Sequence, residues 1–265
     1  MSGFWSLLRL DLALLRRRRL PRWIAGGALG SVVLSIAFSS AGDGEGARLV
    51  ASALRFLVAV IIGLTTVLGA VSISGDAASG ALRGVMLRPV GRPAVVLAHA
   101  TATSLFVMAI YVTGLIIALV AGSTLCGYGD VLYEEYVVIG ADEMAGFMFR
   151  LVLLPLPALL IPPLLALCIS TRMDDGATAV VLALVATVGP LLFGFVSGDV
   201  PEWVFTERAM HPATVLGKLA QGYQLDADRV DSVEYIAACV WQPALWLISF
   251  AGLGILLFHR REIHT

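Results

Sequence analysis

Charged residues are scarce in this chain. Of its 265 residues only 14% are charged, whereas 58% are hydrophobic, and the mean hydropathy is +0.89. A soluble domain carries about 25% charged residues. A water-soluble fold of this length has no room to hide so much apolar surface, because about a quarter of the unfolded-chain surface stays exposed. The composition therefore excludes a water-soluble single domain and a disordered chain, and it indicates a membrane protein.

Several kinds of chemical site are missing as well. The three cysteines are too few for a disulfide scaffold. The sequence contains no CxxC, no HExxH and no Walker A phosphate loop, and its four histidines do not cluster. The basic residues are not in excess, which leaves nucleic-acid binding without an electrostatic footprint. The sequence thus predicts no catalytic residue, no metal site and no ATP site in this chain.

Six apolar segments are each long enough to cross a membrane, since a spanning helix needs about 20 mostly apolar residues. We therefore expect an all-α integral membrane protein with a single transmembrane domain over residues 1–265. The fourth segment contains four prolines, so its helix is expected to kink or break. The six expected spans are 23–39, 56–74, 94–121, 147–170, 177–196 and 238–258.

The distribution of charge predicts the orientation. Six spans place both termini on one side, and that side collects 12 cations and 5 acids, a net charge of +7. The opposite side holds 6 cations and 14 acids, a net charge of −8. Positively charged loops stay in the cytoplasm. We therefore expect cytoplasmic termini.

Two segments outside the spans have helical patterns. Residues 4–20 place Ser6, Arg9, Ala13 and Arg16 on one stripe, with apolar residues around it, although Asp11 falls nearly opposite Arg9. This pattern suits an amphipathic elbow helix in the membrane interface, and a plain topology anchor for the first span is the alternative.

The second segment is the outer loop over residues 197–236, which contains a short amphipathic pattern after Pro212 that presents Val215, Leu216, Leu219 and Tyr223. A helix there would cap the outer mouth or dip back into the bilayer. A solvated acidic loop is the other interpretation of the same residues.

The inner loop over residues 75–93 is the most informative segment. Residues 78–87 can form a short helix that Pro89 and Gly91 end. Such a helix can dock into a groove of a soluble partner through Leu82, Val85 and Leu87. A basic loop that only fixes topology is the alternative.

This loop resembles that of the membrane subunits of type-2 ATP-binding-cassette exporters. Their pattern is an acidic residue, a Gly-Thr-Leu step, paired leucines, Pro-Val-Ser-Arg and, about seven residues on, a lysine. The corresponding residues here are Asp76, Gly80-Ala81-Leu82, Leu87, Pro89-Val90-Gly91-Arg92 and His99. Thr is thus replaced by Ala81, Ser by Gly91 and Lys by His99.

Both ends of the chain also resemble this family. Leu10-Asp11-Leu12, followed by an arginine run, is similar to its elbow helix, and residues 258–263 are similar to its C-terminal tail. The resemblance implies a permease in the cytoplasmic (inner) membrane of a prokaryote, paired with a second copy or paralogue. Two separate ATPase subunits would bind ATP and Mg²⁺, and this chain would hold no cofactor.

The resemblance also implies roles for particular residues. The loop would couple the ATPases to the spans through Asp76, Gly80, Leu82, Arg83, Leu87, Pro89 and Arg92. The second and fifth spans would line the pathway, with Thr65, Thr66 and Phe193 as candidate lining residues, although small polar residues also serve helix packing.

Two other functions remain open on the sequence. A non-transporting assembly factor or sensor would recruit a soluble partner through the same loop at 75–93. An intramembrane enzyme is less favoured, because no set of polar residues converges within the spans.

Overall fold

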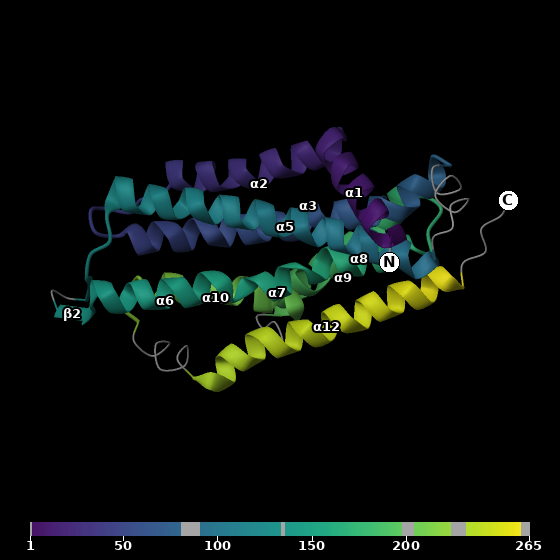
Figure 1. The fold of residues 1–265 in the computed structure, drawn as a ribbon. Helices are drawn as coiled ribbons and strands as arrows, with labels where there is room; N and C mark the ends of the chain where they lie inside the picture. Colours follow the sequence, from purple (N-terminus) through teal and green to yellow (C-terminus); the bar gives the residue numbers. More distant parts are fainter. Residues whose placement is uncertain (1, 81–90, 134–135, 198–203, 224–231, 261–265) are drawn as a thin grey trace.

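The computed structural model is an elongated bundle whose long helices run roughly along one axis (Figure 1). It describes residues 2–80, 91–133, 136–197, 204–223 and 232–260. The first half comprises α1 (Ser2–Arg17), α2 (Arg19–Ala37), α3 (Gly46–Ala78), α5 (Arg92–Ala121) and the π-helical turn η1 (Gly122–Cys126). A hairpin of β1 (Val131–Tyr133) and β2 (Tyr136–Ile139) precedes α6 (Ala141–Leu153), α7 (Pro155–Leu159), α8 (Ile161–Ser170), α9 (Gly176–Ser197), α10 (Phe205–Leu219) and α12 (Val233–His259).

Five helical segments in the described residues are long and apolar enough to cross a membrane, which supports an all-α membrane protein. They are Arg19–Ala37, Gly46–Ala78, Arg92–Cys126, Ala141–Ser170 and Val233–His259. The sixth expected span falls in α9, whose apolar part Gly176–Pro190 is shorter than these five. The number of six spans therefore stays a prediction, as do the interfacial place of α1 and the side of the membrane on which the termini lie.

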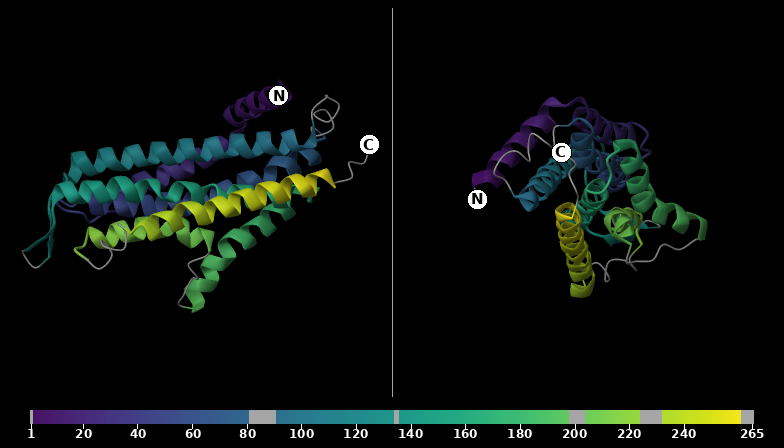
Figure 2. Two further views of the ribbon diagram at one scale, coloured as in Figure 1. Left: turned by 60° about the horizontal axis from the view of Figure 1, so that its bottom comes forward. Right: turned by 90° about the vertical axis from the view of Figure 1, so that its right-hand side faces the viewer.

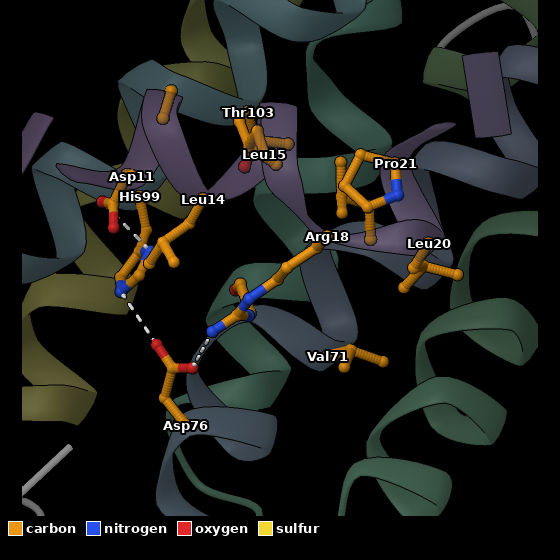
Figure 3. Close-up of a pocket in the computed structure, with 13 residues that line it drawn as sticks. Asp11, Leu14, Leu15, Arg18, Leu20, Pro21, Val71, Asp76, His99 and Thr103 are labelled. Carbon is orange, nitrogen blue, oxygen red and sulfur yellow. Dashed lines mark hydrogen bonds and ion pairs between the residues drawn. The ribbon is translucent and has the colours of Figure 1, made fainter. Parts of the chain in front are cut away.

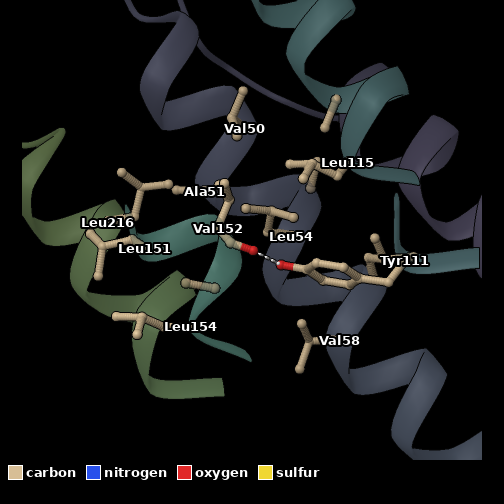
Figure 4. Packing of buried hydrophobic residues seen from close by; sticks show 14 of the residues in the cluster. Val50, Ala51, Leu54, Val58, Tyr111, Leu115, Leu151, Val152, Leu154 and Leu216 are labelled. Atoms are coloured by element: carbon tan, nitrogen blue, oxygen red, sulfur yellow. Dashed lines mark hydrogen bonds between the residues drawn. The ribbon is translucent and has the colours of Figure 1, made fainter. Parts of the chain in front are cut away.

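The proline-rich segment is broken where the sequence predicted a kink. Helices α6, α7 and α8 follow one another with interruptions at Leu154 and Leu160, because proline has no N–H to continue the helical hydrogen bonds. Just before the first interruption, the Tyr111 hydroxyl donates a 2.6 Å hydrogen bond to the Val152 carbonyl (Figure 4). This bond joins α5 to the broken helix within the buried core.

Helix α3 forms the centre of the bundle. It packs against α2, α5, α8, α9 and α10, and its Leu54, Leu57 and Ile61 are fully buried. Helix α12, by contrast, lies along one side of the bundle and is mostly exposed (Figure 1). The exposed apolar side chains of α12, such as Ile248, suit contact with lipid.

The outer loop predicted at 197–236 contains a longer helix than the sequence indicated. Helix α10 begins at Phe205 and has Pro212 in its interior, so the prediction of a helix starting after Pro212 was wrong. Val215, Leu216 and Leu219 are buried, whereas Tyr223, which belongs to the same predicted pattern, lies beyond the end of the helix and is exposed. The three buried residues belong to a helix that packs on α3, α6 and α7, so this part of the loop is integral to the bundle.

The bundle has two distinct ends, which both views show (Figures 1 and 2). The terminal end holds α1, the last turn of α3, the first turn of α5 and the end of α12. The hairpin end holds the β1–β2 hairpin, the end of α2 and the start of α3. Both described chain ends therefore lie at the same end of the molecule.

Candidate coupling site

Four charged or titratable side chains meet at the terminal end (Figure 3). The Nδ1 atom of His99 lies 3.2 Å from a carboxylate oxygen of Asp11, and its Nε2 atom lies 3.9 Å from Asp76. The other carboxylate oxygen of Asp76 accepts a 2.9 Å hydrogen bond from the Arg18 guanidinium. We call Asp11, Arg18, Asp76 and His99 the ion cluster.

Each member comes from a different helix or junction. Asp11 is on α1, Asp76 is in the last turn of α3 and His99 is in the second turn of α5. Arg18 separates α1 from α2 in an extended conformation, with φ −67° and ψ 147°. The break in the helix at Arg18 lets α1 turn toward α5, against which it packs. The cluster therefore joins four segments at one point.

Burial determines the electrostatics of this cluster. The side chains of Asp11 and Asp76 are 10% exposed and that of His99 is 15% exposed, whereas Arg18 is 47% exposed. Burial raises the pKa of Asp11, and Asp76 adds to that effect, while His99 and Arg18 oppose it. Buried carboxylates need such partners, because an isolated buried charge is strongly destabilising.

The ion cluster forms the polar wall of a pocket between α1, α2, α3 and α5. Leu14, Leu15, Leu68 and Val71 are among its apolar lining residues. Within the described residues, no three His, Cys, Asp or Glu side chains are spaced to hold a metal ion. The arrangement is suited to holding helix ends together.

The predicted coupling residues lie on both sides of this cluster. Asp76 belongs to it, and Gly80 follows α3 with φ +73° and its N–H bonded to the Ala77 carbonyl at 3.1 Å. At the other end of the loop, the Arg92 guanidinium donates a 2.8 Å bond to the carbonyl of His259, the last residue of α12. The remaining predicted coupling residues, Leu82, Arg83, Leu87 and Pro89, lie outside the described residues.

The candidate lining residues lie elsewhere in the bundle. Thr65 and Thr66 are fully buried and donate to the carbonyls of Ile61 and Ile62 in their own helix. The Thr66 hydroxyl also donates a 3.4 Å hydrogen bond to the Thr187 hydroxyl of α9, and this contact helps α3 pack on α9. The side chain of Phe193 lies outside the described part of α9. A role of these residues in lining a pathway stays a prediction.

The pairing of Asp11 with His99 was not predicted from the sequence. Two signals pointed to them, because Asp11 falls on the apolar side of an amphipathic pattern and His99 is a polar residue in an apolar segment. Each is a polar residue where the pattern requires an apolar one, and such residues find partners when buried.

Neither a known protein-family model nor a curated protein sequence matches this chain. The family resemblance therefore rests on the motif residues alone.

Proposed function

We propose that this chain is the membrane-spanning subunit of an ATP-driven ATP-binding-cassette exporter. It forms the substrate pathway with a second permease copy or a paralogue, and two separate ATPase subunits bind at its terminal end. The resemblance of residues 76–99 to the coupling loop of such permeases supports this function, together with the apolar helices.

The observation that carries the proposal is how the two ends of the 75–93 loop are held. On one side, Asp76 contacts Arg18 at the α1–α2 junction and His99 on α5. On the other side, Arg92 bonds to the end of α12. A partner that moves this loop would thereby displace α1, α2, α3, α5 and α12 together.

Coupling of this kind needs only two arrangements of the helices and a partner that prefers one of them. ATP and Mg²⁺ act on the partner subunit, and the chain itself transmits the preference. The ion cluster supplies the rigid connection, because its buried carboxylates keep their partners in either arrangement or lose stability.

Purification of the tagged full chain in mild detergent tests the proposal. We expect an ATPase subunit, and ATP hydrolysis, to accompany the chain. Leu87→Asp should abolish this association, because a carboxylate would replace an apolar anchor of the loop. Leu125→Asp is the matched control, since Leu125 is an exposed leucine at the hairpin end.

Two results would contradict the transporter. A chain that purifies alone under conditions that preserve other membrane complexes has no ATPase partner. A soluble partner without ATPase activity would instead establish the non-transporting recruiter, the alternative that uses the same loop.

A further inference from the structure

A basic groove lies between α3 and α10 at the hairpin end. Helix α3 contributes Arg48 and Arg55, which are seven residues apart and therefore share a face, and Lys218 comes from the last turn of α10. Ser52 and Thr214 place hydroxyl groups in the same groove. We call these five residues the basic groove.

Small residues make the floor of this groove. Ala51 and Ala213 are 3% exposed, and a Cβ atom added to Gly217 would lie 3.7 Å from the Cβ of Ala51. The two helices therefore approach closely with no bulky side chain between them. The cationic side chains line the same pocket as these small residues, and a small anion has room there.

Of the three cations in the groove, Arg48 and Lys218 have partners, and Arg55 differs from them. Arg48 lies 3.3 Å from a carboxylate oxygen of Glu45. The Arg55 guanidinium donates a 3.1 Å bond to the Thr214 hydroxyl, and among the described residues it has no carboxylate partner. The sequence predicts six cations and 14 acids on the outer side of the protein. Three of those six cations lie in this one groove.

Arg55 lies just before the long uncharged part of α3. It is about 13 Å along α3 from the first residue, Gly46, at 1.5 Å per residue. The chain from Phe56 to Gly75 then contains no charged residue. Arginine at the boundary of an apolar span is stabilised by lipid phosphates, because it reaches the headgroup layer with its long side chain.

A second groove adjoins the first and shares Arg48 and Ser52 with it. It lies between α2 and α3, and exposed Leu34, Phe38 and Phe56 line it. A molecule with an anionic head in the basic groove would find an apolar surface beside it. The two grooves together therefore match an amphiphile better than a small soluble anion.

We propose that the basic groove binds the phosphate group of an anionic membrane lipid, whose apolar part lies along the adjoining groove. Arginine binds phosphate through two parallel hydrogen bonds. The hydroxyl groups of Ser52 and Thr214 donate to the carbonyls of Leu49 and Met210, so the donors to a phosphate are the cations. This site is independent of the transporter function proposed above, since it uses none of the terminal-end residues.

Native mass spectrometry of the full chain in detergent tests this proposal. The probes are dioctanoyl phosphatidylglycerol, dioctanoyl phosphatidylcholine and inorganic phosphate. We expect the anionic lipid to bind at least 10-fold more tightly than the zwitterionic one. Arg55→Gln combined with Lys218→Gln should remove that preference. Glu45→Gln should strengthen it, because the competing carboxylate is lost.

Arg150→Gln is the matched control, because Arg150 is an exposed arginine of α6 that does not line the groove. Thermal melting without lipid verifies that each variant is folded. Equal binding of the two lipids, or a loss with Arg150→Gln as large as with the double variant, would overturn the proposal. Tight binding of inorganic phosphate with no preference for the anionic lipid would overturn the assignment to a lipid.

Discussion

The two ends of the bundle hold their charged residues in opposite ways. At the terminal end, the carboxylates of Asp11 and Asp76 are buried and face His99 and Arg18. At the hairpin end, the cations of the basic groove line an open channel, and Arg55 has only a hydroxyl partner among the described residues. The first arrangement is complete within the chain. The second leaves positive charge available to an anion from outside.

This difference separates two uses of charge. A buried charge that loses its partner destabilises a fold strongly, so the ion cluster must be kept whole for stability. An exposed charge contributes little to folding, so the basic groove can stay open for binding. Substitutions at the terminal end should therefore change stability, and those at the hairpin end should change binding.

The largest effect is expected for His99→Leu. The substitution removes the imidazole that lies beside both carboxylates, so that Arg18 is the only basic side chain left in the cluster. Breaking a buried pair in this way costs about 3 kcal/mol. Thermal melting of the purified chain in detergent would show this as a marked drop in Tm.

Asp11→Asn in the His99→Leu background should restore part of the lost stability, because it removes one of the two carboxylates. A double variant that is no more stable than His99→Leu alone would show that packing, rather than charge, accounts for the loss.

A smaller loss is expected for Gly80→Ala, at the point where α3 ends. Gly80 has φ +73°, and an L-residue in this region costs about 1 kcal/mol. Gly80→Asn should lose less, since asparagine tolerates this conformation. The control is Gly91→Ala at the other end of the loop, where φ is −66° and an added Cβ meets only Pro93, at 3.8 Å. Equal losses at both glycines would contradict a backbone cause.

The sequence predicted the parts of this comparison that depend on local pattern. Apolar length gave the helices, and proline gave the interruptions of α6, α7 and α8, because both effects act within one segment. The acidic residue of the loop, Asp76, was also identified. Its partners were not, because Arg18 is 58 positions away and only the turn between α1 and α2 brings the two together.

The hairpin end was harder to predict. Its groove needs α10, a helix that the sequence pattern predicted only as a short helix after Pro212 in an outer loop. Nothing in the local pattern shows that Lys218 lies beside Arg55, since their helices are far apart in the chain. Small residues such as Gly217 allow the close approach, and their effect appears only when both helices are placed.

The burial of Asp11 predicts how the stability of the chain depends on pH. Burial raises the pKa of Asp11 above its ordinary value of 3.8. The folded chain therefore holds that proton more readily than the unfolded chain. The resulting stability is fully present below pH 3.8 and is lost as the pH rises through the higher folded-state pKa.

Melting the chain and Asp11→Asn side by side from pH 4 to pH 7 measures this effect. The native chain should lose stability relative to the variant as the pH rises, because only the native chain must bury a carboxylate beside Asp76. A difference in Tm that stays constant over this range would contradict the direction of the shift.

The smallest effect on stability is expected for Arg55→Gln. The side chain is exposed, and a glutamine amide can still donate to Thr214, so the free energy of unfolding should change by less than about 0.5 kcal/mol. Thermal melting of this variant should therefore match the native chain while anionic lipid binding falls. A loss comparable to that of His99→Leu would mean that Arg55 braces α3 against α10. The two ends would then use charge in the same way, and the groove would be part of the fold rather than a site for an outside anion.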